Sequence, residues 1–468
     1  MVTRSALETS VLEKIRPQAD EHAHIHAIAG MLIDSVNQSG SATGMIVGSV
    51  ARDTWIRGDR DLDIFMLFPP DLPREELEAE GLALARRVTE SANGTCREKY
   101  AEHPYINATI DGLDVDIVPC YAVPDAAAIR SAVDRTPFHT RYIKDRVKNL
   151  IDDVLLLKQF AKNGGIYGSD QMTEGFSGYL CELLVYHYGG FTPLLSAASD
   201  WWPGVLIDLS NHRTKTFHEP LIVVDPVDPG RNVSASVSLT RMCEFIELCR
   251  GYLERPVEGF FILHKPCPGS RESVTMLVEQ RKTTLYTLTF PTPPYIEEIV
   301  VPQLRKSLDA ISALLARHEF VVNRAAYRMH TDRCMLLFEL LTDSLPPITR
   351  HFGPPLWARE NARQFSEKYI RGMDEGRIFS GPYIENGIYV VELARRYSNA
   401  GELLASPDLL EVRLGRHVRS EIRDSLTVKC GLNCLDEEFI TFITSFLEKA
   451  SPLTQIRQRE NKGSGTER

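Results

Sequence analysis

Three aspartates stand in a pattern that suits metal-assisted chemistry. Asp61 and Asp63 alternate along an apolar segment, and Asp116 stands in a second segment of the same kind. Residues two apart in a strand point to the same face, about 7 Å apart, so Asp61 and Asp63 converge and Asp116 adds a third carboxylate from a neighbouring strand. Such a cluster repels itself unless cations neutralise it, and a few hard oxygen ligands suit Mg²⁺. The pattern predicts a two-metal site.

A Gly48-Ser49 pair predicts an anion site beside these carboxylates. It stands between a short buried strand over 45–47 and a helix expected over 50–57, where free backbone N–H groups and the helix dipole favour a phosphate. The Ser49 hydroxyl and Arg52, one turn further on, reach the same anion. Together these parts indicate in-line attack of a hydroxyl on an α-phosphate, with pyrophosphate leaving. Each motif alone is also typical of an ordinary turn or a chance pair of acids.

Alternating strands and helices position these residues. The hydrophobic spacing predicts helices over 5–16, 18–37 and 74–92 and strands over 61–68, 105–110 and 113–118. This order makes residues 1–147 one mixed α/β domain. Asp114 shares a face with Asp116, and we interpret it as a solvated or salt-bridged carboxylate.

The remaining chain divides into three further parts. Residues 148–256 are expected to form a mostly helical domain, with loops over 164–176 and 202–236. Residues 257–453 return to short strands around a helix near 302–318, which indicates an α+β region. Residues 454–468 carry too little apolar surface to offset the entropy of ordering, so we expect a flexible tail. The fold class is therefore multidomain, with α/β, helical and α+β parts.

Composition limits the classes of partner. The 468 residues carry 53 Lys and Arg against 63 Asp and Glu, a net charge of −10, which excludes an indiscriminate polycation. A nucleic-acid partner therefore requires a local basic surface, and residues 301–372 offer one, with 11 Lys and Arg against 7 Asp and Glu, a net of +4. The segment is also consistent with an ordinary mixed surface. No apolar signal core or membrane-spanning stretch is present, so we expect a cytoplasmic protein without a membrane partner.

Two other groups of metal-binding residue types are interpreted as structural. The nine cysteines are scattered without a C-x-x-C pair, as in reduced proteins of the cytosol. Cys430 and Cys434 lie in a turn with no second pair to complete a zinc site. His22, His24 and His26 cannot all share one face of a helix, so we interpret them as solvated surface residues.

Longer motifs extend the pattern along nearly the whole chain. They resemble the polymerase-beta-like nucleotidyltransferase superfamily and, more closely, the archaeal-type (class I) tRNA CCA-adding enzymes. The blocks that carry the resemblance are Gly48–Gly58, Ala101–Tyr105, Asp116–Tyr121, Ser131–His139, Gly165–Gly168, Phe176–Leu184 and Val224–Val233. The later blocks are not shared by general nucleotidyltransferases, and they favour the narrower family. Family members often have Glu where Asp61 stands, and Tyr or Thr where Val50 stands.

The resemblance implies a nucleotidyltransferase head, a helical neck and an α+β body and tail. It implies template-independent addition and repair of the 3′-terminal CCA of tRNA from CTP and ATP, with Mg²⁺ as cofactor and a homodimer as the assembly. Asp61, Asp63 and Asp116 would hold the metals. The residues that the resemblance assigns to nucleotide binding are Ser49, Arg52, Thr136, His139, Lys158, Tyr167 and Arg231.

Several alternatives stay open. The chain is also compatible with another nucleotidyltransferase, such as a poly(A)-polymerase-like, oligoadenylate-synthetase-like or antibiotic-modifying enzyme, or with a non-catalytic tRNA-binding protein. Lys158 is also typical of a solvated helix lysine, and Tyr167 of a packing aromatic. Arg231 would read the incoming base, or alternatively form a structural salt bridge with Asp225 or Asp228.

Overall fold

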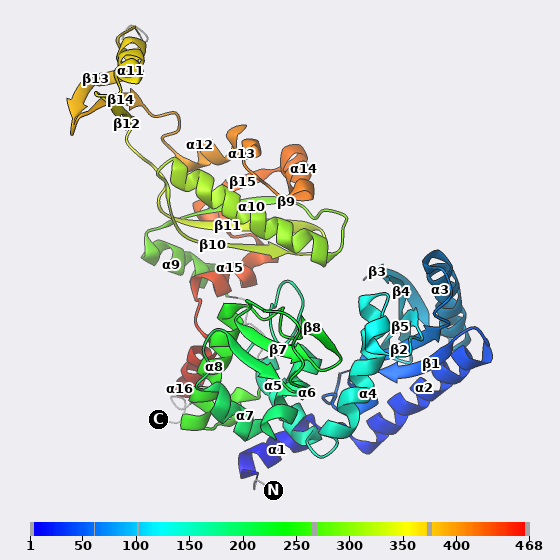
Figure 1. Cartoon of the computed structure of the whole chain (residues 1–468). Helices are drawn as coiled ribbons and strands as arrows, with labels where there is room; N and C mark the ends of the chain where they lie inside the picture. The colour runs from blue at the N-terminus through cyan, green and yellow to red at the C-terminus, as the bar shows by residue number, and fades with distance from the viewer. Residues whose placement is uncertain (1–3, 60, 101–102, 264–268, 372–376, 464–468) are drawn as a thin grey trace. The chain divides into compact units, whose positions relative to one another are not determined.

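The structure, a computed structural model, describes residues 4–59, 61–100, 103–263, 269–371 and 377–463. Two compact units make up the chain, Met1–Lys265 with Ala450–Arg468, and Pro266–Lys449 (Figure 1). The chain thus returns to its first unit after completing the second. The domain boundaries expected at residues 147 and 256 both fall inside the first unit and stay a prediction.

The N-terminal part of the first unit is built around a five-stranded sheet. The strand order is β1-β2-β5-β4-β3, with β2 and β5 parallel and the other pairs antiparallel. The predicted α/β alternation is confirmed, and the exposed polar strand β3 is an addition to it. The elements of this part are α1 (Ala6–Ile15), α2 (Ala19–Gln38), β1 (Thr43–Val47), β2 (Asp61–Phe68), α3 (Arg74–Ser91), β3 (Thr95–Tyr100), β4 (Pro104–Ile110), β5 (Leu113–Tyr121) and α4 (Thr136–Val147).

Helices α2 and α3 cover one face of this sheet. Along β2, Leu62, Ile64 and Met66 are buried in one core with apolar residues of both helices. Because successive strand residues point to opposite faces, this packing turns Asp61 and Asp63 to the other face. The same alternation in β5 turns Asp116 away from the helices.

The second part of the first unit is mostly helical, as expected, but it also contains a small sheet. Strands β6, β7 and β8 pair in that order within the segment predicted as loops over 202–236. That prediction was wrong because β7 is buried throughout, and a short apolar run without alternation gives no strand period. The elements are α5 (Ile151–Asn163), α6 (Gly178–Tyr188), α7 (Phe191–Ala198), β6 (Val205–Asp208), β7 (Leu221–Asp225), β8 (Asp228–Asn232) and α8 (Leu239–Glu254).

The C-terminal segment is helical as far as it is described. Residues Pro452–Gly463 form α16, whereas a flexible tail was predicted from residue 454 onward. Ile456 is only 3% exposed and belongs to the core of the first unit. The Arg457 guanidinium donates to the Gly251 carbonyl at the end of α8, with an N–O distance of 2.9 Å. For residues 454–463 the prediction was wrong, because α16 buries Ile456 in this core and places Leu453 against Gly251 of α8, which offsets the ordering entropy. Residues 464–468, the rest of the predicted tail, lie outside the described residues.

The second unit contains a four-stranded sheet, β10-β11-β9-β15, and a separate three-stranded sheet, β12-β14-β13. Helix α10 packs on one face of the larger sheet, and α9 and α15 on the other. The predicted α+β region is confirmed. Its elements are α9 (Arg271–Arg281), β9 (Thr284–Pro291), α10 (Glu297–Arg317), β10 (Val321–Met329), β11 (Arg333–Thr342), β12 (Ile348–Pro355), α11 (Arg359–Arg371), β13 (Ile378–Glu385), β14 (Ile388–Ala394), α12 (Ala400–Leu404), α13 (Asp408–Glu411), α14 (Arg416–Ser425), β15 (Thr427–Cys430) and α15 (Ile440–Leu447).

A buried carboxylate anchors this second unit. The Glu339 side chain on β11 is fully buried and accepts hydrogen bonds from Arg281 (2.5 Å), Thr283 (2.8 Å) and Asn323 (2.7 Å). Burial by itself raises the pKa of Glu339, but these hydrogen bonds outweigh it and hold the pKa at about 2. The folded state therefore binds the ionised form more favourably than the unfolded chain does.

Replacing this carboxylate should destabilise the second unit. Glu339→Gln leaves Arg281 and Arg324 without their counterion, so we expect a loss of about 2–3 kcal/mol at pH 7, measured by native-state hydrogen exchange of β9 and β11. Because folding lowers the pKa of Glu339, its stabilising contribution is present above about pH 4.5 and is lost as the pH falls toward 2. The stabilities of the wild type and of Glu339→Gln should therefore become equal near pH 2. Glu385→Gln, at an exposed pair with Arg350, should match the wild type throughout.

Candidate active site

The three predicted carboxylates lie on one face of the N-terminal sheet. In the parallel pairing of β2 with β5, Asp63 is the register partner of Asp116 and Asp61 that of Asp114. Val47, the last residue of β1, pairs with Asp63 on its other side. The structure therefore brings Asp61, Asp63 and Asp116 together at the end of β1.

The surroundings of Asp61, Asp63 and Asp116 raise the pKa of all three carboxyl groups. Burial raises the pKa of Asp63 to about 6, with repulsion from Asp116 adding to the effect and Arg52 opposing it. Burial also raises the pKa of Asp116, against a hydrogen bond of 2.7 Å from the Asn107 amide. Burial and the nearby Asp59 raise the pKa of Asp61. Asp63 and Asp116 are half-buried and Asp61 is exposed, and a group of hard oxygen donors that carries excess negative charge fits a divalent cation.

The turn after β1 explains the glycine of the Gly48-Ser49 pair. Gly48 has a φ of +70°, and a Cβ at this position would lie 1.9 Å from Oδ2 of Asp63. Only glycine allows the backbone to approach the carboxylate so closely. Ser49 makes no side-chain capping hydrogen bond in this turn, so its hydroxyl is not used as a helix cap.

The helix expected over 50–57 is a single 3₁₀ turn, Val50–Arg52. It ends because Asp53 adopts the left-handed conformation, with a φ of 56°. The prediction of a helix was wrong, and the predicted anion site therefore has no helix macrodipole behind it.

Arg52, a predicted phosphate ligand, and Lys158, a predicted residue of the nucleotide pocket, lie in one buried network. The Arg52 Nε atom is 2.8 Å from Oε2 of Glu182, and Lys158 Nζ is 3.3 Å from Oε1. Lys158 also donates to the Thr54 carbonyl, at 2.8 Å, and the Thr54 hydroxyl donates to Glu182, at 2.5 Å. Glu182 is fully buried, and its two cationic partners lower its pKa although burial opposes them. The network contains two basic groups for one carboxylate, although burial lowers the pKa of Lys158.

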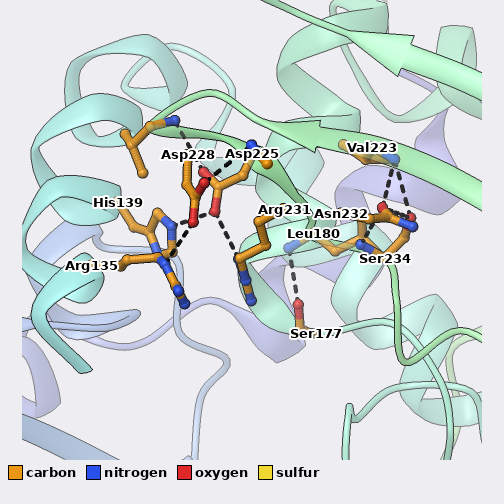
Figure 2. A network of polar contacts seen from close by, with 12 residues as sticks. Arg135, His139, Ser177, Leu180, Val223, Asp225, Asp228, Arg231, Asn232 and Ser234 are labelled. Atoms are coloured by element: carbon orange, nitrogen blue, oxygen red, sulfur yellow. Dashed lines mark hydrogen bonds and ion pairs between the residues drawn. The ribbon is translucent and has the colours of Figure 1, made fainter. Parts of the chain in front are cut away.

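His139 and Arg231 line a cavity of about 690 Å³. Figure 2 shows both side chains directed at the buried Asp225, whose Oδ2 lies 2.8 Å from Nε2 of His139 and 2.7 Å from Nη1 of Arg231. Arg135 forms a second ion pair with Asp228 beside them, at 2.9 Å. Burial alone raises the pKa of Asp225, but the hydrogen bonds from His139 and Arg231 lower it on balance. Arg231 therefore forms the salt bridge that the alternative interpretation expected, while 37% of its side chain stays exposed.

Thr136 and Tyr167 lie apart from that lining. Thr136 begins α4, one turn before His139. Tyr167 pairs through its backbone with Phe176, and its ring centre lies 5.4 Å from the Lys162 ammonium. Burial raises the pKa of the Tyr167 hydroxyl. Among the described residues, neither these two nor Lys158 contribute to the lining of the cavity.

Several residues of the site escaped the sequence analysis. Asn107 on β4 contacts both Asp114 and Asp116, so Asp114 is hydrogen-bonded rather than merely solvated. The Tyr179 ring stacks on His139, with a centroid distance of 4.3 Å. The sequence does contain a signal for Glu182, because it is a lone carboxylate within the apolar run 180–185 of α6, which indicates a buried charge with a partner.

Three family models match consecutive parts of the chain. A nucleotidyltransferase domain matches residues 32–139, the second domain of tRNA nucleotidyltransferase matches 152–262, and the C-terminal domain of CCA-adding enzyme matches 281–431. A CCA-adding enzyme of Methanoregula boonei is 57% identical over 96% of both chains. The chain belongs to the CCA-adding enzyme family. A CCA-adding enzyme of Methanosarcina barkeri is 40% identical over 90% of this chain and 93% of its own chain. A CCA-adding enzyme of Haloarcula marismortui is 40% identical over 90% of this chain and 94% of its own chain.

Membership in the CCA-adding enzyme family confirms the expected fold class, with a nucleotidyltransferase head, and makes the protein an enzyme rather than a non-catalytic tRNA-binding protein. It also favours this family over the other nucleotidyltransferases considered. Nucleotidyltransferases of this superfamily generally use divalent metals, which agrees with the carboxylate cluster. No helix within the described ranges is long and apolar enough to cross a membrane.

Proposed function

We propose that this chain adds and repairs the 3′-terminal CCA of tRNA, using CTP and ATP and releasing pyrophosphate. The observation that carries the proposal is the pairing of Asp63 with Asp116 under the Gly48–Ser49 turn, in a chain of this family. In the reaction, the 3′ hydroxyl of the tRNA attacks the α-phosphorus of the nucleotide, and the bond to the pyrophosphate oxygen breaks.

Asp61, Asp63 and Asp116 are the residues that would hold Mg²⁺. The ion, when bound, neutralises the carboxylates and the triphosphate and lowers the pKa of the attacking hydroxyl. Ser49 and Arg52 would bind the triphosphate, and Lys158 lies beside Arg52 on the same carboxylate. The Glu182 carboxylate contacts both basic residues, so its role would be to orient them.

His139 and Arg231, which line the cavity, would form the nucleotide pocket together with Thr136, Lys158 and Tyr167 from outside that lining. Asp225 contacts both His139 and Arg231, and it would fix the orientation of the imidazole and the guanidinium (Figure 2). A fixed guanidinium can donate to the ring nitrogen N3 of cytosine or N1 of adenine, which accept hydrogen bonds, whereas N3 of uracil and N1 of guanine carry a hydrogen and are themselves donors.

The partners that we propose are tRNA, CTP and ATP, in the cytoplasm, with a homodimer as the assembly. The net charge of +4 over residues 301–372 supports contact with the tRNA backbone by shape and charge. The acidic net charge of the whole chain is compatible with this, because RNA responds to the local surface.

The function is tested with tRNA transcripts that lack the 3′ end. CTP alone should add two residues and stop, ATP alone should add none, and both together should add C, C and A and then stop. Continued addition of A from ATP would instead indicate a poly(A)-polymerase-like enzyme. Addition to free nucleotides without tRNA would indicate an oligoadenylate-synthetase-like one.

Arg231→Ala should lower both the rate and the nucleotide selectivity. Once a bound nucleotide covers this guanidinium, a wrong base would leave one of its donors unpaired, at a cost of about 1–3 kcal/mol. Discrimination against UTP and GTP should therefore fall by about 5- to 100-fold, measured as ratios of kcat/KM. Lys215→Ala, which changes another basic residue of the same cavity, should leave these ratios unchanged. An Arg231→Ala protein with a lower Tm and wild-type selectivity would assign Arg231 to the salt bridge alone.

A further inference from the structure

Two histidines of α2 converge on Asp53, outside the site described above. The Nε2 atoms of His22 and His26 lie 2.8 and 3.4 Å from the same oxygen, Oδ1 of Asp53. All three candidate ligand atoms lie within 4.8 Å of one another. The side chains are 45%, 35% and 45% exposed for His22, His26 and Asp53, so an ion from solvent can reach them.

Helical spacing explains the convergence. His22 and His26 are four residues apart, so they share one face of α2, and their ring centres are 4.3 Å apart. His24 projects elsewhere and lies 3.5 Å from Asp111. The interpretation of all three histidines as solvated surface was therefore incomplete, because two can share a face when the third does not.

The third ligand comes from the turn after Arg52. Asp53 is the left-handed residue that ends the 3₁₀ turn, and its carboxylate meets α2 from a different segment of the chain. Two imidazoles and one carboxylate are a ligand set for a borderline divalent ion of the zinc class, with water in the fourth position. Bonds of about 2.0–2.1 Å at tetrahedral angles place ligand atoms about 3.3 Å apart, which small side-chain adjustments would produce here.

We propose that His22, His26 and Asp53 form a binding site for Zn²⁺ or a similar transition-metal ion. The bound ion would take the place of the Nε2 protons that His22 and His26 direct at Asp53. It would thereby link α2 to the turn that contains Ser49 and Arg52. This site differs from the carboxylate cluster in its ligand chemistry, since Mg²⁺ prefers an all-oxygen set. The proposal does not depend on the proposed function.

The test measures Zn²⁺ binding to the full chain after metal removal. Isothermal titration in excess Mg²⁺ keeps the carboxylate cluster occupied, so the difference between variants reports this site. His22→Ala, His26→Ala and Asp53→Asn should each weaken the binding at least about tenfold. Asn tolerates the left-handed conformation of residue 53, so Asp53→Asn keeps the turn. His24→Ala is the matched control and should bind as the wild type does.

Thermal unfolding supplies a second readout. Zn²⁺ should raise the Tm of the wild type and of His24→Ala, because it binds the folded state, and should not raise that of His22→Ala/His26→Ala. Circular dichroism of the metal-free variants checks that they are folded. Equal Zn²⁺ affinity in the wild type and the double variant would overturn the proposal. A wild-type protein that binds no stoichiometric Zn²⁺ ion in the titration would also overturn the proposal.

Discussion

Asp63→Ala and Asp116→Ala should each abolish incorporation of both CMP and AMP, with losses in kcat of more than about 1,000-fold. Both carboxylates belong to the site proposed for the metal, which both nucleotides need. The measurement is single-nucleotide addition to tRNA that lacks its end, combined with a tRNA-binding assay, in which the affinity should stay near that of the wild type.

Asp114→Ala is the matched control for this pair. Asp114 lies on the same strand and face, two residues from Asp116, but it is exposed and its register partner is Asp61. It should keep most of the activity. Near-normal turnover of Asp63→Ala or Asp116→Ala, or an equal loss in Asp114→Ala, would contradict the assignment of the metal ligands.

The carboxylate cluster that is proposed to support activity should also lower the stability of the metal-free protein. The pKa of Asp63 is raised to about 6, so the metal-free folded state disfavours the ionised form of this carboxyl group. The contribution of Asp63 to the free energy of unfolding is therefore most favourable below about pH 4, and it is lost as the pH rises toward 6. Asp63→Asn removes that charge. In a chelator at pH 7 the inactive variant should therefore be about 1–2 kcal/mol more stable than the wild type, and this gain should vanish near pH 4.

Glu182→Ala should have the largest structural effect in the first unit. It leaves Arg52 and Lys158 buried without a counterion, which costs about 3–5 kcal/mol. The milder Glu182→Gln keeps the volume and a hydrogen-bond acceptor for Thr54. We expect it to fold, and to raise the KM for CTP and ATP alike while the tRNA affinity stays unchanged, because the two basic side chains lose their fixed orientation.

Thermal unfolding and steady-state kinetics together decide the role of Glu182. Glu244→Gln, at a part-buried pair with Arg241 on α8, is the control and should change neither quantity. A Glu182→Gln protein with a lower Tm but wild-type KM values would restrict Glu182 to a structural role. Recovery of the KM in Glu182→Asp would support orientation by the carboxylate.

Local periodicity by itself determined much of the first unit and the candidate metal ligands. The period of two along β2 placed Asp61 and Asp63 on one face, since apolar residues between them must face the core. The period of 3.6 placed α2 and α3 to within about two residues of their observed ends, because an amphipathic helix must bury one stripe. The longer motifs also identified the family.

Only the tertiary structure decided which distant residues meet. The parallel register that sets Asp63 beside Asp116, the burial of Arg52 and Lys158 on Glu182, and the meeting of Asp53 with α2 all join segments far apart in the chain. The edge strand β3 has no apolar face, and α16 orders only because α8 offers it a surface. A residue pattern encodes which face of its own segment is buried, whereas the partner of that face depends on how the whole chain packs.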